Sequence, residues 1–136
     1  MNAYNTSRQC ITDYYVRDVK TVSYFVNEIE IVVTLAGEPF SPTTLRDIGA
    51  LRVAYQTLKN DQQSQSLQMP GTNFTAEQTF FLAYAQTQCF QGQDLVQLLR
   101  TRLGNYDEAI AINAALSQMP EFQRAFQCPI RANPCF

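Results

Sequence analysis

The side chains able to do chemistry in this chain are four cysteines and a small set of carboxylates, because its 136 residues include no histidine. A Ser, Thr or Cys nucleophile normally needs a neighbouring base such as His, so the composition argues against a triad hydrolase. Glu28 and Glu30 would share one face of a strand, and two carboxylates can cleave a glycosidic bond. Charges on an exposed strand edge explain this pair better, so we assign it no catalytic role.

The four cysteines, Cys10, Cys89, Cys128 and Cys135, are widely spaced and form no Cys-x-x-Cys pair. Zinc sites usually combine close Cys pairs with His, so this spacing does not indicate one. An even number of distant cysteines predicts two disulfides and an oxidising compartment. The other interpretation is a reduced cytosolic protein with four buried thiols.

Two glycosylation sequons agree with an extracellular setting. The triplets at 5–7 (Asn-Thr-Ser) and 73–75 (Asn-Phe-Thr) make Asn5 and Asn73 candidate glycosylation sites. The N-terminal residues lack the basic and apolar parts of a signal peptide. We interpret Met1 as a start residue added to a mature chain, and we predict a secreted protein.

Length and charge limit the class of partner. The chain fits one domain, 1–136, and 46% hydrophobic residues is an ordinary globular value. The net charge of -2 leaves no basic stripe for phosphates, so we expect no nucleic acid partner. No apolar run reaches the roughly 18 residues of a membrane span, so we expect no membrane span.

The strongest helix signals lie in the middle of the chain. Ser41 can serve as an N-cap with Pro42 as the first helical residue. Thr75 is followed three residues later by Gln78, which completes a capping box. Together with apolar residues at helical spacing, these signals predict helices over 6–19, 41–60, 75–91, 94–103, 106–116 and 120–127.

Residues 21–35 are rich in Val, Ile, Tyr, Phe and Thr, which favours a hairpin with strands Val22–Val26 and Ile29–Leu35. The sequence therefore predicts a compact, disulfide-bonded domain that is mainly α-helical with a small β hairpin. Within this domain, irregular ends are expected at 1–5 and 129–136, and an exposed loop at 60–73.

Apolar spacing also predicts which helix faces are buried. The helix that begins near Thr75 is apolar on its sides and is expected to be central. The side chains expected to point inward are Leu45, Ile48, Leu51, Tyr55 and Leu58, then Phe81, Ala85 and Cys89, then Leu95, Leu98 and Leu99. An aromatic stripe formed by Tyr14, Tyr15, Tyr24 and Phe25 would suit an interface, although we favour ordinary core for it.

Three stretches carry a resemblance to a known family. Residues 47–55 (Asp-Ile-Gly-Ala-Leu-Arg-Val-Ala-Tyr), 80–86 (Phe-Phe-Leu-Ala-Tyr-Ala-Gln) and 121–128 (Glu-Phe-Gln-Arg-Ala-Phe-Gln-Cys) resemble, in order and spacing, the C-terminal end of the neprilysin family of zinc metallopeptidases. The likeness covers roughly 6–136 and is poorest at 20–41. It implies the fold of the C-terminal part of the neprilysin catalytic domain.

The resemblance identifies four active-site positions. The family carries Glu-x-x-x-Asp, whose Glu ligates zinc and whose Asp orients a ligating His. In this chain Thr43 takes the Glu position and Asp47 the Asp position. Near the run Gly-Asn-Tyr-Asp, Thr101 stands where the family has a His, and Asp107 where it has an Arg. Both family residues help to stabilise an anionic transition state, which Thr and Asp do not.

These replacements imply that the site is degenerate. The family's His-Glu-x-x-His motif lies upstream of the matched region and has no counterpart here. We interpret Asp47 as a residue of a helix first turn, where negative charge suits the helix dipole. We predict no catalytic residue, no metal ligand and no cofactor, zinc included.

Family analogy also suggests the cysteine pairing. Cys10 would pair with Cys135, whereas the family counterparts of Cys89 and Cys128 bond to cysteines of an N-terminal region. In this chain we favour a bond between Cys89 and Cys128, with a bond to another chain as the alternative.

The function implied is that of a secreted, catalytically inactive neprilysin-like domain that acts by binding protein. The partner would be a receptor, a peptidase, a peptide or a second copy in a homodimer, and the role that of an effector, toxin or ligand. The alternative is a small subunit or regulator of an active neprilysin-like peptidase.

Overall fold

The computed structural model describes residues 2–61, 70–105, 107–130 and 134–135. In chain order the elements are helix α1 (Ala3–Tyr14), the π-helical turn η1 (Tyr15–Val19), strands β1 (Thr21–Val26) and β2 (Ile29–Thr34), and helices α2 (Ser41–Asn60), α4 (Ala76–Thr87), α5 (Asp94–Arg102), α6 (Glu108–Ser117) and α7 (Pro120–Ala125). The predicted fold class, mainly helical with a small antiparallel hairpin, is confirmed.

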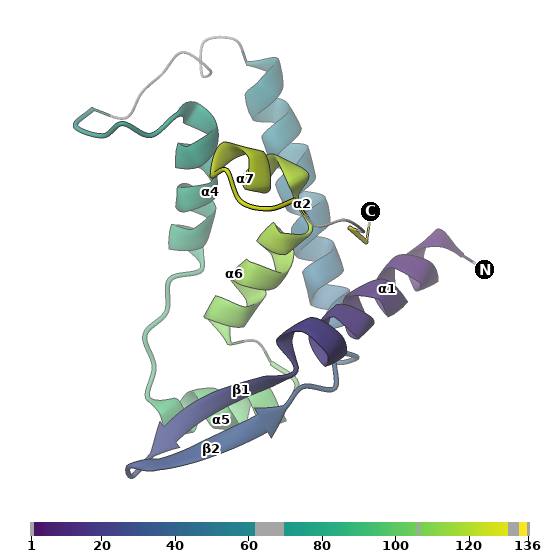
Figure 1. Ribbon diagram of the computed structural model, residues 1–136, viewed down its shortest axis with the longest axis vertical. Helices are drawn as coiled ribbons and strands as arrows, with labels where there is room; N and C mark the ends of the chain where they lie inside the picture. The colour runs from purple at the N-terminus through teal and green to yellow at the C-terminus, as the bar shows by residue number, and fades with distance from the viewer. Residues whose placement is uncertain (1, 62–69, 106, 131–133, 136) are drawn as a thin grey trace.

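The helices form a bundle with the hairpin at one end (Figure 1). Helix α2 packs against both α1 and α6, while α7 packs against α4 and α6. Helix α5 covers one face of the hairpin. Lys20 joins η1 to β1 and residues 35–40 join β2 to α2, so the chain passes between the bundle and the hairpin at these points.

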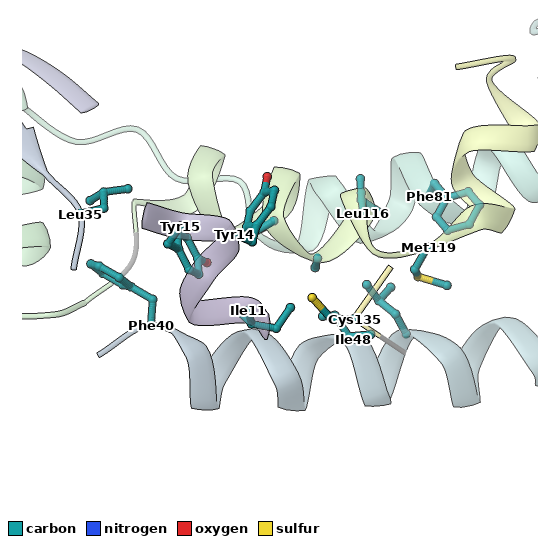
Figure 2. Close-up of a cluster of buried hydrophobic side chains, with 13 residues drawn as sticks. Ile11, Tyr14, Tyr15, Leu35, Phe40, Ile48, Phe81, Leu116, Met119 and Cys135 are labelled. Atoms are coloured by element: carbon teal, nitrogen blue, oxygen red, sulfur yellow. The ribbon is translucent and has the colours of Figure 1, made fainter. Parts of the chain in front are cut away.

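The hydrophobic core lies where α1, η1, α2, α4 and α6 converge (Figure 2). Ile11, Tyr15 and Ile48 are fully buried there, and burying an aliphatic or aromatic side chain of this size contributes about 1.5–3 kcal/mol. The other labelled members of the cluster are Tyr14, Leu35, Phe40, Phe81, Leu116, Met119 and Cys135.

A disulfide between Cys10 and Cys135 ties α1 to the end of the described chain across a sequence separation of 125. Hydrogen bonds also fix the backbone of Cys135 independently of the disulfide, because its N–H donates to Gln118 Oε1 at 2.9 Å. Its carbonyl accepts a hydrogen bond of 3.2 Å from the Ser7 hydroxyl. The predicted Cys10–Cys135 pairing is confirmed, and it closes the core at this end.

The hairpin follows the predicted boundaries within one residue at the start of β1 and the end of β2. Its register places Val26 opposite Ile29 and Tyr24 opposite Ile31. The two tip residues, Asn27 and Glu28, both have positive φ, at 51° and 65°, which is the geometry of a type I′ turn. Glu28 therefore lies in the turn and not on a strand face beside Glu30.

The N-terminal half of the chain differs from prediction in three places. Residues 3–5 are helical and not irregular, because Asn2 caps α1 by accepting the Tyr4 N–H at 3.3 Å. The predicted single helix over 6–19 changes to π-helical geometry at Tyr15. Ser41 is the first residue of α2 and not its N-cap, and its hydroxyl donates to the Glu38 carbonyl at 3.2 Å.

In the C-terminal half, several residues that apolar spacing predicted to be buried are exposed. Leu98 is buried against the hairpin, but Leu95 and Leu99 are 47% and 51% exposed, since α5 meets other elements on one face only. Helix α4 ends at Thr87, so Cys89 does not extend the Phe81 face. Phe81 is the buried residue of α4, and the helix is peripheral rather than central in the described part of the chain.

The predicted irregular segments are partly described. Helix α2 ends at Asn60, as predicted, and Pro70 to Asn73 form no helix or strand. Pro129, Ile130 and residues 134–135 are also irregular. The rest of the predicted loop and tail, residues 62–69, 131–133 and 136, lies outside the described residues, as do Met1 and Tyr106.

The capping box at the start of α4 gives the first testable prediction. Thr75 Oγ1 accepts the Gln78 N–H at 3.2 Å, and the Gln78 side chain accepts the Thr75 N–H at 3.0 Å. We expect Thr75→Ala to lower the free energy of unfolding by about 1 kcal/mol, because an orphan helix N–H loses its acceptor. Urea denaturation measures the change.

The matched control is Thr57→Ala, at an exposed threonine inside α2 whose hydroxyl bonds to the Val53 carbonyl at 3.0 Å. Alanine is the better helix former, so this change should be neutral or stabilising. Equal losses at positions 57 and 75 would contradict a capping role for Thr75.

Candidate functional site

A polar cavity of about 440 Å³ lies between α2 and the α5–α6 connection. Thr43 and Asp47, two of the four positions that the resemblance assigns to an active site, line it from one face of α2 because they are four residues apart. The residues that complete the lining are Arg46, Gln88, Arg100, Asn105, Glu108 and Ala111. The cavity therefore extends from α2 to Asn105 of the Gly-Asn run, which the resemblance places near an active site.

Asp47 does not occupy the helix first turn as predicted. Helix α2 begins at Ser41, and no acidic residue lies in its first turn. The Asp47 carboxylate forms a 3.6 Å ion pair with Arg46, which is 73% exposed. Burial raises the pKa of Asp47, and the Arg46 charge opposes that rise. An ion pair with such an exposed arginine contributes little to stability. The Arg46 charge therefore offsets only a small part of the cost of burying the Asp47 carboxylate.

Thr101 and Asp107, the other two positions predicted from the resemblance, do not line the cavity. Thr101 is buried, and its hydroxyl shares a 2.6 Å hydrogen bond with the Tyr24 hydroxyl of β1. The Tyr24 hydroxyl also donates to Asp107 Oδ2 at 3.3 Å. Burial, foremost, raises the pKa of Tyr24. Thr101 and Asp107 thus anchor the hairpin to the α5–α6 connection.

Asp107 has a second structural role as the N-cap of α6. Its Oδ1 accepts the N–H groups of Ala109 at 3.0 Å and Ile110 at 3.4 Å. A carboxylate at this point also suits the positive end of the helix dipole. Asp107, where the resemblance implies an Arg, therefore caps helix α6 in this chain.

Arg100 and Glu108 form the best-developed ion pair of the cavity, with 2.6 Å between Nη2 and Oε1. The second oxygen, Oε2, accepts a 3.0 Å hydrogen bond from Gln97. The guanidinium also lies over the Phe90 ring, 5.0 Å from its centroid. Burial pushes the pKa of Glu108 upward, but the hydrogen bonds from Gln97 and Arg100 outweigh it, and the net pKa is lowered.

This lowered pKa predicts a pH dependence of stability. The charged form of Glu108 is favoured in the folded state, so its contribution is present above the ordinary Glu pKa of 4.5 and is lost as pH falls through the lower folded value. We expect Glu108→Gln to lower the free energy of unfolding by about 1–3 kcal/mol at pH 7. The difference from the wild type should shrink below pH 4, as measured by urea denaturation across the range.

The control for this pH series is Glu28→Gln at the exposed hairpin tip. That change should leave the free energy of unfolding nearly unchanged at pH 7. A gap between wild type and Glu108→Gln that stays constant from pH 7 to pH 3 would contradict the ion-pair explanation.

A second, apolar hollow of about 380 Å³ runs between α2 and α4, and we call it the α2–α4 groove. It shares Asp47 and Gln88 with the polar cavity, so the two are continuous. Its other lining residues are Ala50, Leu51, Ala54, Phe80, Ala83, Tyr84 and Thr87. Burial and then the Asp47 charge raise the pKa of Tyr84 to about 12, so its hydroxyl stays protonated at neutral pH.

Cys89 and Cys128 do not bond to each other. Both are free thiols on the exposed surface, so the internal disulfide favoured from the sequence is wrong for this structure. Cys89 follows the end of α4, and Cys128 follows α7. The alternative left open by the sequence, a bond to another chain, stays a prediction.

The two predicted glycosylation sites are both exposed. Asn5 lies within the first turns of α1, whereas Asn73 lies in irregular chain ahead of the Thr75 cap. Glycosylation at either residue stays a prediction. Of the aromatic stripe, Tyr14, Tyr15 and Tyr24 are buried, as favoured, but Phe25 is 61% exposed.

The charged residues of the cavity wall, Arg46, Arg100 and Glu108, were not predicted from the sequence. Arg46 and Arg100 carried no motif, and the pairing of Arg100 with Glu108 joins separate helices, so no local spacing pointed to it. Asn105 was visible in the Gly-Asn run.

Among the described residues, no helix has the length and apolarity needed to cross a membrane.

The donors present do not fit a zinc ion. The chain has no histidine, and the described residues contain no group of three His, Cys, Asp or Glu side chains placed to share a metal. At the cavity, the two carboxylates Asp47 and Glu108 are each paired with an arginine. Zinc sites in enzymes use three protein ligands, and this donor set falls short.

Comparison with known proteins supports the resemblance seen in the sequence. The family model described as Peptidase family M13 matches residues 1–134. Neprilysin-3 of Drosophila melanogaster is 33% identical over 99 residues, 70% of this chain and 13% of that protein. Endothelin-converting enzyme homolog of Locusta migratoria is 27% identical over 98% of this chain and 18% of its own length.

Endothelin-converting enzyme-like 1 of Homo sapiens is 28% identical over 62% of this chain and 11% of its own length. The chain thus spans less than a fifth of the length of these relatives. No solved structure matches the chain at a significant level.

Proposed function

The chain belongs to peptidase family M13, and from this premise we propose that it is a catalytically inactive member that is secreted and acts by binding another protein. The proposal concerns the segment matched to the family, which forms the C-terminal part of the neprilysin-like catalytic domain. It depends on the chemistry of the four active-site positions.

One observation carries the proposal of inactivity: each altered active-site position is occupied by a residue without the family's chemistry, and two have structural bonds of their own. Thr43 offers no carboxylate for a metal. Thr101 is buried against Tyr24, and Asp107 caps α6. A negative Asp107 opposes an anionic transition state, where the resemblance implies a positive side chain.

Metal chemistry is accordingly not part of the proposal. Asp47 keeps the position of the family's orienting Asp, but it has no histidine of this chain to orient. A single carboxylate paired with an arginine does not hold zinc at useful affinity. Asp47 is better explained as a polar element of the cavity wall.

The binding role rests on exposed apolar side chains. Leu95, Leu99 and Leu103 of α5 and the residue that follows it are 47%, 51% and 78% exposed. Large apolar groups gathered on a surface often mark protein interaction sites. The Cys10–Cys135 disulfide agrees with secretion, and in that compartment the exposed thiols of Cys89 and Cys128 are available to a partner chain.

The test of inactivity is a chimera in which this chain replaces the matched segment of an active M13 peptidase. We expect a folded, secreted chimera without zinc-dependent peptide cleavage. A second chimera that also carries Thr43→Glu, Thr101→His and Asp107→Arg should regain measurable cleavage. Peptide hydrolysis and zinc content are measured for both, with circular dichroism as the folding control.

Cleavage by the first chimera would overturn the inactive assignment. The binding role is tested separately with the folded chain immobilised through Cys128 and exposed to extracellular fluid. A retained protein should be lost from the double variant Leu95→Lys, Leu99→Lys and kept by Val53→Lys, an exposed site on α2. Equal retention by both variants would rule out the α5 face.

The second candidate function is that of a small subunit or regulator of an active neprilysin-like peptidase. The α2–α4 groove favours it, because its floor of Ala50, Ala54 and Ala83 leaves room for a partner element beside Asp47. This role predicts that adding the chain changes the kcat or KM of such a peptidase. An unchanged rate at saturating chain would exclude it.

A further inference from the structure

Strand β2 has one edge with no hydrogen-bond partner among the described residues. The N–H of Leu35 donates to the Lys20 carbonyl at 2.9 Å, and hydrogen-bonded pairs alternate along an antiparallel ladder. The bonded pairs of the hairpin are therefore Val22 with Val33, Tyr24 with Ile31 and Val26 with Ile29. The intervening residues of β2, Glu30, Val32 and Thr34, point their N–H and C=O groups outward.

The opposite edge of the hairpin, formed by β1, has a hydrogen-bond partner. The outward N–H of Phe25 on β1 donates to Asp94 Oδ2 at 2.6 Å, at the beginning of α5. Helix α5 packs on the hairpin mainly through β1, and β2 forms its outer margin in Figure 1. Asp94 thus occupies one outward donor of β1, whereas no partner is bound to the outward groups of β2 among the described residues.

The side chains of β2 suit pairing. The strand reads Ile-Glu-Ile-Val-Val-Thr, with Glu30 as its single charge. Ile29 and Val32 are 65% and 56% exposed. Natural proteins usually protect such an edge with charged side chains, proline or a bulge. Strand β2 has no proline and a single charge, Glu30, so an incoming strand would meet backbone groups and mostly uncharged side chains.

We propose that β2 pairs in antiparallel fashion with β2 of a second copy of this chain, around a two-fold axis at Val32. Because outward-facing residues must meet, this register sets Val32 against Val32 of the second copy and Glu30 against its Thr34. Each facing pair of this kind exchanges two backbone hydrogen bonds. On the inner face Ile31 meets Val33 of the second copy, and the two hairpins merge into one sheet.

The extent of strand overlap selects this register, because among the symmetric registers only the Val32-centred one places Glu30, Val32 and Thr34 all against outward residues of the second β2. Moving the two-fold axis to Glu30 would place the two Glu30 carboxylates opposite each other, and like charges facing across strands are destabilising. The Val32-centred register avoids that contact and uses all three outward residues of β2.

This inference goes beyond the proposed binding role of the α5 face, because it uses another surface, the β2 edge, and names the partner there as a second copy. The two can fail separately. A monomeric chain without cleavage activity would remove only the dimer, whereas a dimer that cleaves peptides as a chimera would remove only the inactive assignment.

The first test uses sedimentation equilibrium from low micromolar to near-millimolar concentration. All variants carry Cys89→Ser and Cys128→Ser, so that no disulfide links the copies. The parent protein should approach twice the monomer mass of 15.5 kDa. Val32→Pro removes an N–H that the hairpin does not use and that the edge position tolerates, so the monomer should fold while the dimer weakens at least about tenfold.

The matched control is Ser23→Pro, at the residue that faces Val32 across the hairpin. Its N–H also points outward, but from the β1 edge, so the dimer should persist. Near-ultraviolet circular dichroism checks that both variants keep the native core. Dimerisation that survives Val32→Pro, or a parent protein that stays monomeric at the highest concentration, would overturn the proposal.

A charge exchange tests the register. Val32→Lys and Val32→Glu should each be monomeric alone, because like charges would face each other at the two-fold axis. Mixing the two should restore a heterodimer, seen by native mass spectrometry. Self-association of Val32→Lys alone would indicate that residue 32 faces Glu30 instead, and would refute the Val32-centred pairing.

Discussion

Replacing Cys10 and Cys135 together by serine is expected to lower the free energy of unfolding by about 4 kcal/mol. The bridge spans a separation of 125 residues, so the unfolded chain gains the freedom of a very long loop when it is absent. Small globular domains are stable by only about 5–15 kcal/mol, and this loss removes a large share. Urea denaturation of the double variant against the parent protein gives the difference.

We expect the double variant to keep the native fold. The Cys135 backbone keeps its bonds to Gln118 and Ser7, and Gln118 is fully buried. Much of the loss therefore belongs to the unfolded state, and the urea midpoint should fall while near-ultraviolet circular dichroism stays close to that of the parent at zero urea. A variant with no native signal at zero urea would show that the bridge is required for folding itself.

The control is Cys89→Ser, at an exposed free thiol. It should change the free energy of unfolding by no more than about 0.5 kcal/mol. If Cys89→Ser costs as much as the double substitution, the thiol of Cys89 takes part in a bond that this structure does not contain.

Features set by neighbouring residues were predictable from the sequence. The Thr75 capping box depends on one residue and the residue three positions later, and it forms as predicted. The hairpin follows from β-branched residues on both sides of a short tip, and the mainly helical class follows from apolar spacing. Such signals are local, so one chain is enough to recognise them.

Features set by tertiary packing were not predictable in the same way. Leu95, Leu98 and Leu99 are all apolar, and only the position of the hairpin decides that Leu98 alone is buried. Asp47 lies in the second turn of α2 because the helix begins at Ser41. The Arg100–Glu108 pair joins two helices, and nothing in the spacing of either helix indicates it.

The candidate site was likewise predictable only in part. The family resemblance located Thr43, Asp47, Thr101 and Asp107, but it did not predict that the last two would bond to Tyr24 of the hairpin. That contact is a property of this chain's own fold. These structural bonds of Thr101 and Asp107 are the physical support for the proposal that the site is inactive.

Phe81→Ala is expected to lower the free energy of unfolding by about 3–5 kcal/mol. Phe81 is 1% exposed and meets three aromatic rings, with centroid separations of 5.7 Å to Tyr55, 5.2 Å to Phe80 and 5.3 Å to Phe122. It therefore connects α2, α4 and α7. The truncation removes buried surface and leaves a cavity that the bundle cannot fill, and alanine's better helix propensity offsets well under 1 kcal/mol.

Leu82→Ala is the matched control, since Leu82 is the next residue of the same helix and is 37% exposed. In the isolated chain it should cost less than about 1 kcal/mol, because little buried area is lost. Both variants are measured by urea denaturation of the monomer at low concentration. A loss at position 82 equal to that at Phe81 would mean that another surface covers this face of α4 in solution, and the peripheral place of α4 would be wrong.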